Sequence, residues 1–353
     1  DADYILKTNV PEGQECYEAA VDMVDKGCNI IFADSFGHEP FMIQAAQEYP
    51  NVQFCHSTGT RAHTEGLANY HNAFASIYEG RYLAGIAAGL KLNEMIDAGK
   101  FSADEAMVGY VGAYTYAEVV SGYTSFFLGV RSVCPTATMK VTFTGSWYDE
   151  ALEKEGAQKL IDMGCKLISQ HADSMGAPTA CENAGIPNVS YNGSTGKACP
   201  NTYIISSRIN WAPYYEYAIK AVMDGTTIDT DWTGTLATGS VVLTDLNTAV
   251  AAEGTAEAIA AATEKLEKGE LHVFDTATFT TRADDTMNAF KVDFLKVDAD
   301  GHITSYLADV DTDQAYAGDT EVVHDGYFAE SEKRSAPYFD LQIDGIELLN
   351  TAM

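Results

Sequence analysis

The sequence predicts an α/β protein of two lobes, each built around a mostly parallel, doubly wound sheet. An internal repeat carries this prediction: Gly27-Cys28-Asn29-Ile30-Ile31 and Pro50-Asn51-Val52 recur, 137 residues later, as Gly164-Cys165-Lys166-Leu167-Ile168 and Pro187-Asn188-Val189. Each copy has the pattern of a helix, a buried strand, a polar loop and a second helix that leads to another strand. Strands separated by helices require parallel crossovers. The length of 353 residues also fits two domains better than one core.

Helix and strand patterns alternate regularly as far as residue 225. Apolar residues at helical spacing predict helices near 13–26, 39–48, 78–97, 117–131, 149–163, 176–184 and 211–224. Short β-rich runs predict strands near 4–8, 29–33, 52–56, 107–112, 138–144, 166–170, 188–191 and 203–207. A further helix is expected at 256–268 before Gly269, and residues 290–310 alternate around Asp300-Gly301 as a hairpin does.

Three connections are candidates for crossings between the lobes, namely those near 100–107, 207–211 and 230–240. They predict a first lobe of residues 1–106 and 211–236, and a second lobe of residues 107–210 and 237–353 that includes a C-terminal extension. The repeat offset aligns Tyr4-Ile5-Leu6 with the strand at 138–144. We therefore expect the first strand-helix unit of the first lobe to be missing upstream of Asp1.

Composition argues against several classes of partner. The chain has 51 acidic and 21 basic side chains, so its net charge of −30 repels nucleic acid and anionic lipid at long range. We expect no nucleic acid polymer as a partner. The cysteines form no Cys-x-x-Cys pair and the histidines no His-Glu-x-x-His motif, so we expect neither a metal nor another cofactor. Asp298-Ala299-Asp300-Gly301 resembles the middle of a calcium loop, but Lys296 and Leu307 stand where its outer ligands belong.

Aromatic and polar residues gather where the predicted strands end. Both copies of the repeat carry an Ala-Asp-Ser-x-Gly loop after a strand, at 33–37 and 172–176. Ligands of open α/β sheets bind beyond the carboxyl ends of the strands, so we expect these loops to face each other across a cleft. Flat rings at such positions can stack on a planar ligand, while hydroxyl, carboxyl, amide, backbone and guanidinium groups can bind its edge. The candidates are Phe36, Trp147 and Trp211 for stacking, and Ser35, Asp173, Asn192, Gly193 and Arg208 for polar contacts.

Catalytic motifs are lacking. The chain has no Gly-x-Ser-x-Gly elbow, no Gly-x-Gly-x-x-Gly loop and no P-loop. His171, Asp173 and Ser174 lie within four positions of one another, whereas the partners of a serine relay come from separate loops. We therefore expect a binding protein and not an enzyme, with no catalytic residues.

Several stretches together resemble the basic membrane protein or purine nucleoside receptor A-like family of ABC transporter substrate-binding proteins. They are Ile-Ile-Phe-Ala-Asp-Ser-Phe-Gly at 30–37, Tyr-Pro-Asn-Val-Gln-Phe at 49–54, Gly-Arg-Tyr-Leu-Ala-Gly-Ile-Ala-Ala-Gly at 80–89, Ser-Trp-Tyr-Asp at 146–149, Gln-His-Ala-Asp-Ser at 170–174 and Asn-Trp-Ala-Pro-Tyr-Tyr at 210–215. The resemblance covers about residues 4–275. It implies a type I periplasmic-binding-protein fold with a three-crossing hinge.

The resemblance also implies the function. A protein of this family would bind a purine nucleoside or nucleobase as a monomer and deliver it to an ABC permease, outside the cytoplasm, in the periplasm or as a cell-surface lipoprotein. By position, Phe36 and Trp147 resemble stacking residues, Asp173 and Asn192 hydrogen-bonding residues, and Arg208 and Trp211 contacts on the hinge side. The loop 191–194 reads Tyr-Asn-Gly-Ser where an aspartate that binds ribose is common, which favours a nucleobase or an altered contact to the sugar.

Two other functions stay open. The same fold can serve as a ligand-sensing domain for a signalling partner, in which case a neighbouring histidine-kinase gene would replace permease genes. A nucleosidase-type enzyme acting in the cleft is the second alternative, and it would release products from inosine.

Overall fold

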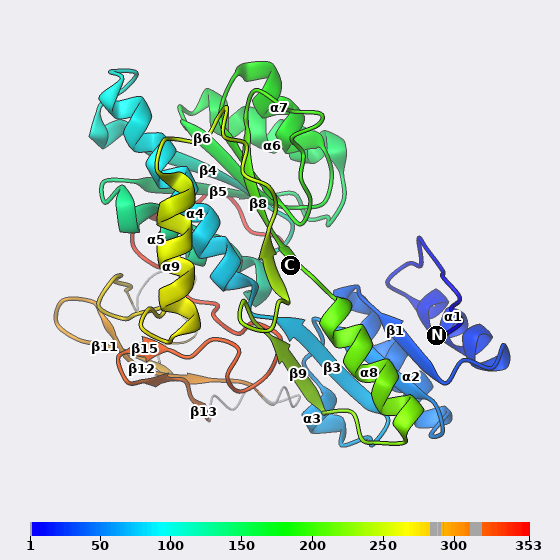
Figure 1. Ribbon diagram of the computed structural model, residues 1–353. Coiled ribbons are helices and arrows are strands. Elements are labelled where there is room, and N and C mark those ends of the chain that lie inside the picture. Colours follow the sequence, from blue (N-terminus) through cyan, green and yellow to red (C-terminus); the bar gives the residue numbers. More distant parts are fainter. Residues whose placement is uncertain (1, 283–287, 289–290, 292, 311–319) are drawn as a thin grey trace.

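Two separate sheets define the two lobes of the computed structural model, which describes residues 2–282, 288, 291, 293–310 and 320–353 (Figure 1). The first sheet has the strand order β1-β2-β3-β9, and the second has the order β10-β8-β7-β6-β4-β5-β16. The predicted fold class is thereby confirmed, because both sheets are mostly parallel and carry helices.

The first lobe is a small doubly wound unit. Its parallel strands are β1 (Ile30–Ala33), β2 (Gln53–Ser57), β3 (Tyr70–Ala75) and β9 (Asp231–Gly234), and its helices are α1 (Gln14–Asp25), the 3-10 turn η1 (Phe36–His38), α2 (Glu39–Glu48), α3 (Ala62–Glu65) and α8 (Ala212–Asp224). Alternate residues of β2 enter different cores. Phe54 packs with Met42 of α2, whereas Cys55 packs with Tyr214 of α8. Helices therefore cover both faces of this sheet.

The second lobe repeats this plan on a larger scale. Its strands are β4 (Met107–Gly112), β5 (Thr138–Phe143), β6 (Leu167–His171), β7 (Asn188–Tyr191), β8 (Tyr203–Ile209), β10 (Val241–Leu243) and β16 (Ile346–Leu348), of which β10 runs antiparallel to β8. Its helices are α4 (Ile77–Asp97), the 3-10 turn η2 (Ala103–Glu105), α5 (Ala117–Val133), α6 (Glu150–Asp162), α7 (Gly176–Ala184) and α9 (Thr255–Glu267). The order β6-β7-β8 matches β1-β2-β3 of the first lobe.

Helix α4 packs in the second lobe, whereas the sequence analysis assigned residues 77–97 to the first. It contacts α5, β8, α9 and β10. Glycines bring the backbones of α4 and α5 together, since a Cβ on Gly85 would lie 2.1 Å from the Phe126 carbonyl oxygen and a Cβ on Gly129 2.0 Å from that of Tyr82. We propose that the first lobe ends near Ser76 and resumes at α8, which moves the first boundary from residue 106.

The chain crosses between the lobes at three places, next to residues 76, 210 and 235–240. Hydrogen bonds join the crossings: Ser76 N donates to the Gly234 carbonyl at 2.7 Å, and Asn210 N donates to the Ser240 carbonyl at 2.7 Å. The predicted crossings near 207–211 and 230–240 match two of these places. The first crossing differs from the predicted region 100–107, because α4 runs along the second lobe before that region is reached.

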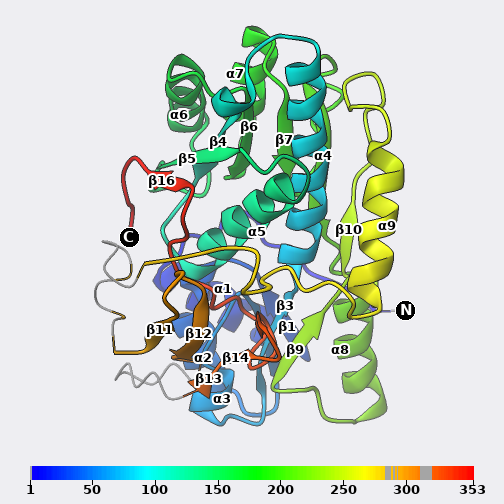
Figure 2. The ribbon, with the colours of Figure 1, turned by 90° about the vertical axis from the view of Figure 1, so that its left-hand side faces the viewer.

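The C-terminal extension lies against the second lobe (Figure 2). It contains β11 (Leu295–Val297) and β12 (Ile303–Ala308), which form the expected hairpin, and the short strands β13 (Thr320–Glu321), β14 (Val323–His324) and β15 (Tyr327–Phe328). It is joined to the main hydrophobic core of that lobe, which includes Phe274, Phe339 and Ile343. Among the described residues, no helix is long and apolar enough to cross a membrane.

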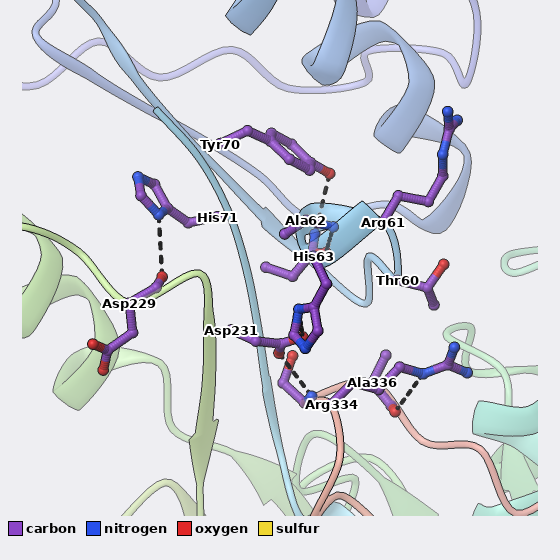
Figure 3. A network of polar contacts seen from close by, with 12 residues as sticks. Thr60, Arg61, Ala62, His63, Tyr70, His71, Asp229, Asp231, Arg334 and Ala336 are labelled. Atoms are coloured by element: carbon purple, nitrogen blue, oxygen red, sulfur yellow. Dashed lines mark hydrogen bonds and ion pairs between the residues drawn. The ribbon is translucent and has the colours of Figure 1, made fainter. Parts of the chain in front are cut away.

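The extension also reaches the first lobe through residues 334–336 (Figure 3). Ser335 N donates to Asp231 Oδ1 of β9 at 2.7 Å, and Asp231 Oδ2 lies 3.5 Å from His63 Nδ1 of α3. The guanidinium of Arg334 donates to the Ala336 and Pro337 carbonyls. These hydrogen bonds stabilise the backbone conformation of the segment. The two lobes are thus linked by the hinge and by this additional contact.

Candidate functional site

A row of aromatic rings connects the two lobes where their strands end. Phe36, in the loop after β1, stacks on Tyr116 of the second lobe with ring centroids 4.8 Å apart and planes at 26°. Tyr116 in turn stacks on Tyr114 at 5.0 Å, and Trp147 meets Tyr114 edge-on at 5.2 Å. Of these four rings, the sequence analysis predicted Phe36 and Trp147. The structure brings these two into one row, which we call the aromatic row.

Tyr114 and Tyr116 were not among the predicted site residues. They lie in the loop between β4 and α5, at the same sheet edge as the loops that follow β5 and β6. The available signal was the strand at 107–112 followed by Ala113-Tyr114-Thr115-Tyr116, a ring-bearing loop at a strand end. The repeat has no counterpart of this loop in the first lobe, so comparing its two copies did not point to it.

A glutamate from the preceding segment holds each Ala-Asp-Ser-x-Gly loop. In the first lobe, Glu12 Oε1 accepts from Ser35 Oγ at 2.5 Å and from Gly37 N at 2.8 Å. In the second lobe, the carboxylate of Glu153 on α6 accepts from Ser174 N at 3.1 and 3.2 Å. The hydroxyl of Ser35, a predicted ligand contact, is therefore engaged by Glu12 of the preceding segment. Phe36 beside it is 36% exposed.

Asp173 lies next to the aromatic row. Its backbone N donates to the Trp147 carbonyl at 2.9 Å, while its side chain stays accessible to solvent. Desolvation by the surrounding protein, followed by the negative charges of Glu118 and Glu153, raises the pKa of Asp173 to about 6. Asp34 of the first lobe adds to the same rise. Carboxyl groups from both lobes thus approach each other at this junction.

Asn192 and Gly193 form an exposed turn after β7. Asn192 has a positive φ of 58°, a conformation that asparagine tolerates better than most residues, and its N–H donates to the Ser207 carbonyl at 3.0 Å. The preceding ring, Tyr191, lies 4.5 Å from the ring of His171. The structure therefore connects this turn to the aromatic row through His171, which is 6.4 Å from Trp147.

Arg208 and Trp211 lie at the hinge. Arg208 is exposed on β8 opposite Val242, close to the second crossing. Trp211 caps the start of α8, and its ring tilts against Phe74 at 6.0 Å, within a buried apolar cluster that also contains Ile77 and Val241. The ring of Trp211 thus contributes to the packing of the hinge.

A buried polar cluster lies against the aromatic row in the second lobe. Arg81 of α4 is 1% exposed, donates from Nη1 to the Gln170 carbonyl at 3.1 Å and covers the Tyr191 ring at 3.9 Å. His171 Nε2 lies 3.3 Å from Glu118 Oε1. Burial raises the pKa of Glu118 to about 7, although the charge of Arg81 acts in the opposite direction. Burial and Arg81 together hold the pKa of His171 well below its ordinary value.

Two cavities of the described structure lie elsewhere. One of about 230 Å³ is bordered by Tyr78, Glu79, His272 and Tyr327, and another of about 340 Å³ lies along β5 and β16. Where the lobes meet, the rings of Phe36 and Tyr116 contact each other directly. A planar ligand between them would need about 7 Å from ring to ring, since carbon atoms in contact are about 3.5 Å apart. Within the described residues, no cluster of three or more metal-binding side chains occurs.

The fold is that of the two-lobed solute-binding proteins. Residues 1–271 match the family model described as ABC transporter substrate-binding protein PnrA-like, and the chain belongs to this family. The family resemblance identified in the sequence is thereby confirmed.

Two curated relatives carry different ligand names. The chain is 34% identical over 218 residues to the "Purine-binding protein BAB2_0673" of Brucella abortus, a match that covers 62% of this chain and 58% of the relative. It is 33% identical over 258 residues to the "Putative ABC transporter glucose-binding protein TsgA13" of Haloferax volcanii, covering 73% of this chain and 62% of that one. The chain thus spans about three fifths of the length of each.

A solved structure with the same fold is that of an ABC transporter solute-binding protein from Aeropyrum pernix. It aligns with a TM-score of 0.63 and 17% sequence identity, covering 80% of this chain and 86% of the other. At this identity the similarity concerns the fold alone.

Proposed function

We propose that this protein is the substrate-binding component of an ABC importer and that it captures a purine base or nucleoside between its lobes for delivery to a membrane permease. The observation that carries the proposal is the Phe36–Tyr116 stack, in which one flat ring from each lobe meets at the ends of the parallel strands. Family membership and the purine-binding relative from Brucella support it. Under this proposal the protein works outside the cytoplasm, as a monomer, in the periplasm or attached to the cell surface as a lipoprotein.

In the proposed complex the ligand lies between Phe36 and Tyr116, whose rings are in direct contact in this structure. An aromatic pair contributes about 0.5–1.5 kcal/mol beyond its buried area, and stacking of a base on a ring about 1–3 kcal/mol. A purine inserted between Phe36 and Tyr116 replaces one ring-ring contact by two ring-base contacts, so the exchange is favourable. Because the two rings belong to different lobes, the inserted ligand also joins the lobes, which gives the permease a ligand-dependent shape to recognise.

Charge favours a ligand without phosphate groups. Asp34 and Asp173 lie at the junction, and the whole chain carries a net charge of −30. A nucleobase or nucleoside is neutral and offers N–H or O–H donors to such carboxylates, whereas a nucleotide would be repelled. We include Asp173, Asn192 and Gly193 among the residues that contact the edge of the ligand, and Trp147, whose ring lies 6.3 Å from that of Tyr116, as a ring of the site that supports Tyr116.

A sugar ligand is the second candidate, because the relative from Haloferax is named a putative glucose-binding protein. Isothermal titration of the purified chain with adenine, hypoxanthine, adenosine, inosine and glucose separates the two. We expect a purine to bind with a dissociation constant near micromolar, about −8 kcal/mol, and to raise the melting temperature, with no response to glucose. Binding of glucose without binding of any purine would replace the proposal by the sugar-binding function. Product formation from inosine would instead indicate an enzyme.

A further inference from the structure

Glu118 presents one carboxylate oxygen to His171 and keeps the other available. It lies in the first turn of α5, two residues after Tyr116 of the aromatic row. Its Oε1 is 3.3 Å from His171 Nε2, and its side chain is 12% exposed, whereas that of His171 is fully buried. Within the described part of the chain, no partner contacts Oε2. Of the two carboxylate oxygens, Oε2 is therefore the one that His171 does not occupy.

His171 is held in one orientation by its surroundings. A Cβ on Gly122 would lie 2.7 Å from His171 Nδ1, so only a glycine at this position of α5 leaves room for the ring. Tyr191 covers the ring at 4.5 Å, and Trp147 lies 6.4 Å away. A buried, neutral imidazole carries a single N–H. When that hydrogen is on Nε2, His171 donates it to Glu118 Oε1 and fixes the direction of the carboxylate.

Arg81 supplies a charge behind this pair. It is almost completely buried, and among the described residues its Nε and Nη2 have no hydrogen-bond partner. Its positive charge acts to lower the pKa of each of four neighbouring groups, namely Glu118, His171, Asp173 and Tyr191. A buried guanidinium next to a carboxyl group favours the ionised carboxylate and so favours a strong hydrogen-bond acceptor at this position.

We propose that Glu118 selects ligands by their hydrogen-bonding edge, accepting an N–H of the bound heterocycle on Oε2 while His171 holds Oε1. The inference rests on the proposed function and adds a residue that determines specificity within it. Glu118 contacts His171, whose ring borders Trp147 of the aromatic row, so the edge of a base stacked on Tyr116 is assigned to this carboxylate. A base that offers only unprotonated ring nitrogens at this edge would place one hydrogen-bond acceptor against another, the carboxylate oxygen, and would therefore bind weakly.

The selection has a pH signature. The titratable and charged groups that face Glu118 are Arg81 of α4, Tyr110 of β4, His171 and Asp173 at the end of β6, and Tyr191 of β7. Burial sets the pKa of Glu118 at about 7 in the empty protein. A ligand N–H binds the carboxylate form only, so affinity rises with pH up to about 7 and then levels off. A single group of this kind weakens binding about tenfold for each pH unit below its pKa.

Titration calorimetry with adenine and with 9-methylpurine, at pH 6 and pH 8, tests the inference on wild type and on Glu118→Gln. Adenine offers N–H groups, whereas 9-methylpurine has none. For wild type we expect adenine to bind roughly tenfold more tightly at pH 8 than at pH 6, and 9-methylpurine to bind more weakly with no such rise. In Glu118→Gln the adenine affinity at pH 8 should fall about tenfold, and its pH dependence between these values should become small.

The matched control is Glu330→Gln, which removes another buried carboxyl group of raised pKa, in the C-terminal extension and away from the aromatic row. Its adenine binding should keep the wild-type pH dependence, even where its stability changes. If adenine binds and Glu118→Gln retains both the affinity and the pH dependence, the inference about Glu118 is wrong and the proposed function stands. If none of the purines binds to wild type, the proposed function itself fails.

Discussion

The two Ala-Asp-Ser-x-Gly loops share a sequence pattern but are anchored in different surroundings. Glu153, which holds the loop of the second lobe, is completely buried, whereas Glu12, which holds the loop of the first lobe, is exposed. The second lobe also contributes Tyr114, Tyr116, Trp147 and the pair of Glu118 and His171, of which His171 is fully buried and Glu118 part-buried. The first lobe contributes the Phe36 ring. Under the proposed function, the second lobe is the preformed half of the site and the first lobe closes over it.

Removal of the buried anchor should have the largest effect. Glu153→Ala leaves Ser174 N and Asp149 N without their acceptor in a buried position, so we expect a loss of about 2–3 kcal/mol in the free energy of unfolding. Glu12→Ala removes an exposed acceptor and should cost below about 1 kcal/mol. Urea denaturation of both variants measures the difference. Equal losses would show that the two loops are anchored alike, against this comparison.

Ligand affinity should depend more on the rings of the second lobe than on that of the first. Trp147→Ala removes a ring that packs on Tyr114 and borders His171, so we expect purine affinity to fall at least tenfold. Phe36→Ala removes one stacking surface but also removes the contact with Tyr116 that the ligand must displace, so its loss should be smaller, about threefold. Calorimetry on the two variants decides. An unchanged affinity in Trp147→Ala would contradict the predicted site.

Stability should fall as the pH rises from 6.5 to 8.5. Burial raises the pKa of Glu79 from 4.5 to about 7 and that of Glu330 to about 8, both outside the first lobe, so the folded protein binds more protons than the unfolded chain in this range. Stability is therefore lost until these groups are ionised in both states. His56 and His171 have lowered pKa values, so they bind fewer protons when folded and oppose this decline only near pH 6.5, where histidines of the unfolded chain lose their protons. Melting temperatures of wild type and Glu79→Gln test this: the decline should be shallower in the variant, and identical slopes would contradict the assignment.

A smaller effect than that of Glu153→Ala is expected at the contact between the extension and the first lobe. Asp231→Ala removes the acceptor of Ser335 N and the partner of His63, which we expect to cost about 1 kcal/mol (Figure 3). Because this contact links the extension to β9, small-angle scattering should also detect a larger radius of gyration in the variant without ligand. A variant as compact as wild type would mean that the hinge alone sets the relation between the lobes.

The sequence was sufficient for the fold because local and long-range patterns agree. The helix predicted at 39–48 is found at Glu39–Glu48, and the strand predicted at 188–191 at Asn188–Tyr191. The repeat then paired equivalent strands, and the order β6-β7-β8 follows that of β1-β2-β3. Residues 4–8, predicted as a strand, form none: Tyr4 and Leu6 are 87% and 73% exposed. A β-rich run needs a neighbouring strand to supply its hydrogen bonds, and sequence pattern alone does not reveal that neighbour.

Strand β3 was missed for a different reason. Its six residues, Tyr70–Ala75, are all buried and include His71 and Asn72, so they show neither alternation nor a continuous apolar run. Their polar groups are satisfied by distant partners: His71 contacts the Asp229 carbonyl and Gln53, and Asn72 accepts from Ala62 N. Such partners come from the assembled tertiary structure.

Part of the candidate site could be predicted, and part required the three-dimensional arrangement. Strand-end position was sufficient to select Phe36, Trp147 and Asp173, which the structure brings together. Glu118 could not be selected this way, because it belongs to a helix and gains its role from His171, which is 53 residues away in the chain. Arg81 belongs to the sequence motif at 80–89 in α4. Nothing in that motif predicts that the helix packs against the second lobe, so the burial of Arg81 there could not be predicted.

The central claim is that a flat ligand is held between one ring of each lobe. A crystal structure of the protein grown with adenine tests it most directly. We predict adenine between Phe36 and Tyr116, with the two ring centroids moved from 4.8 Å to about 7 Å apart and the Glu118 carboxylate at the edge of the base. A structure with adenine bound elsewhere, and these two rings still stacked on each other, would contradict the account.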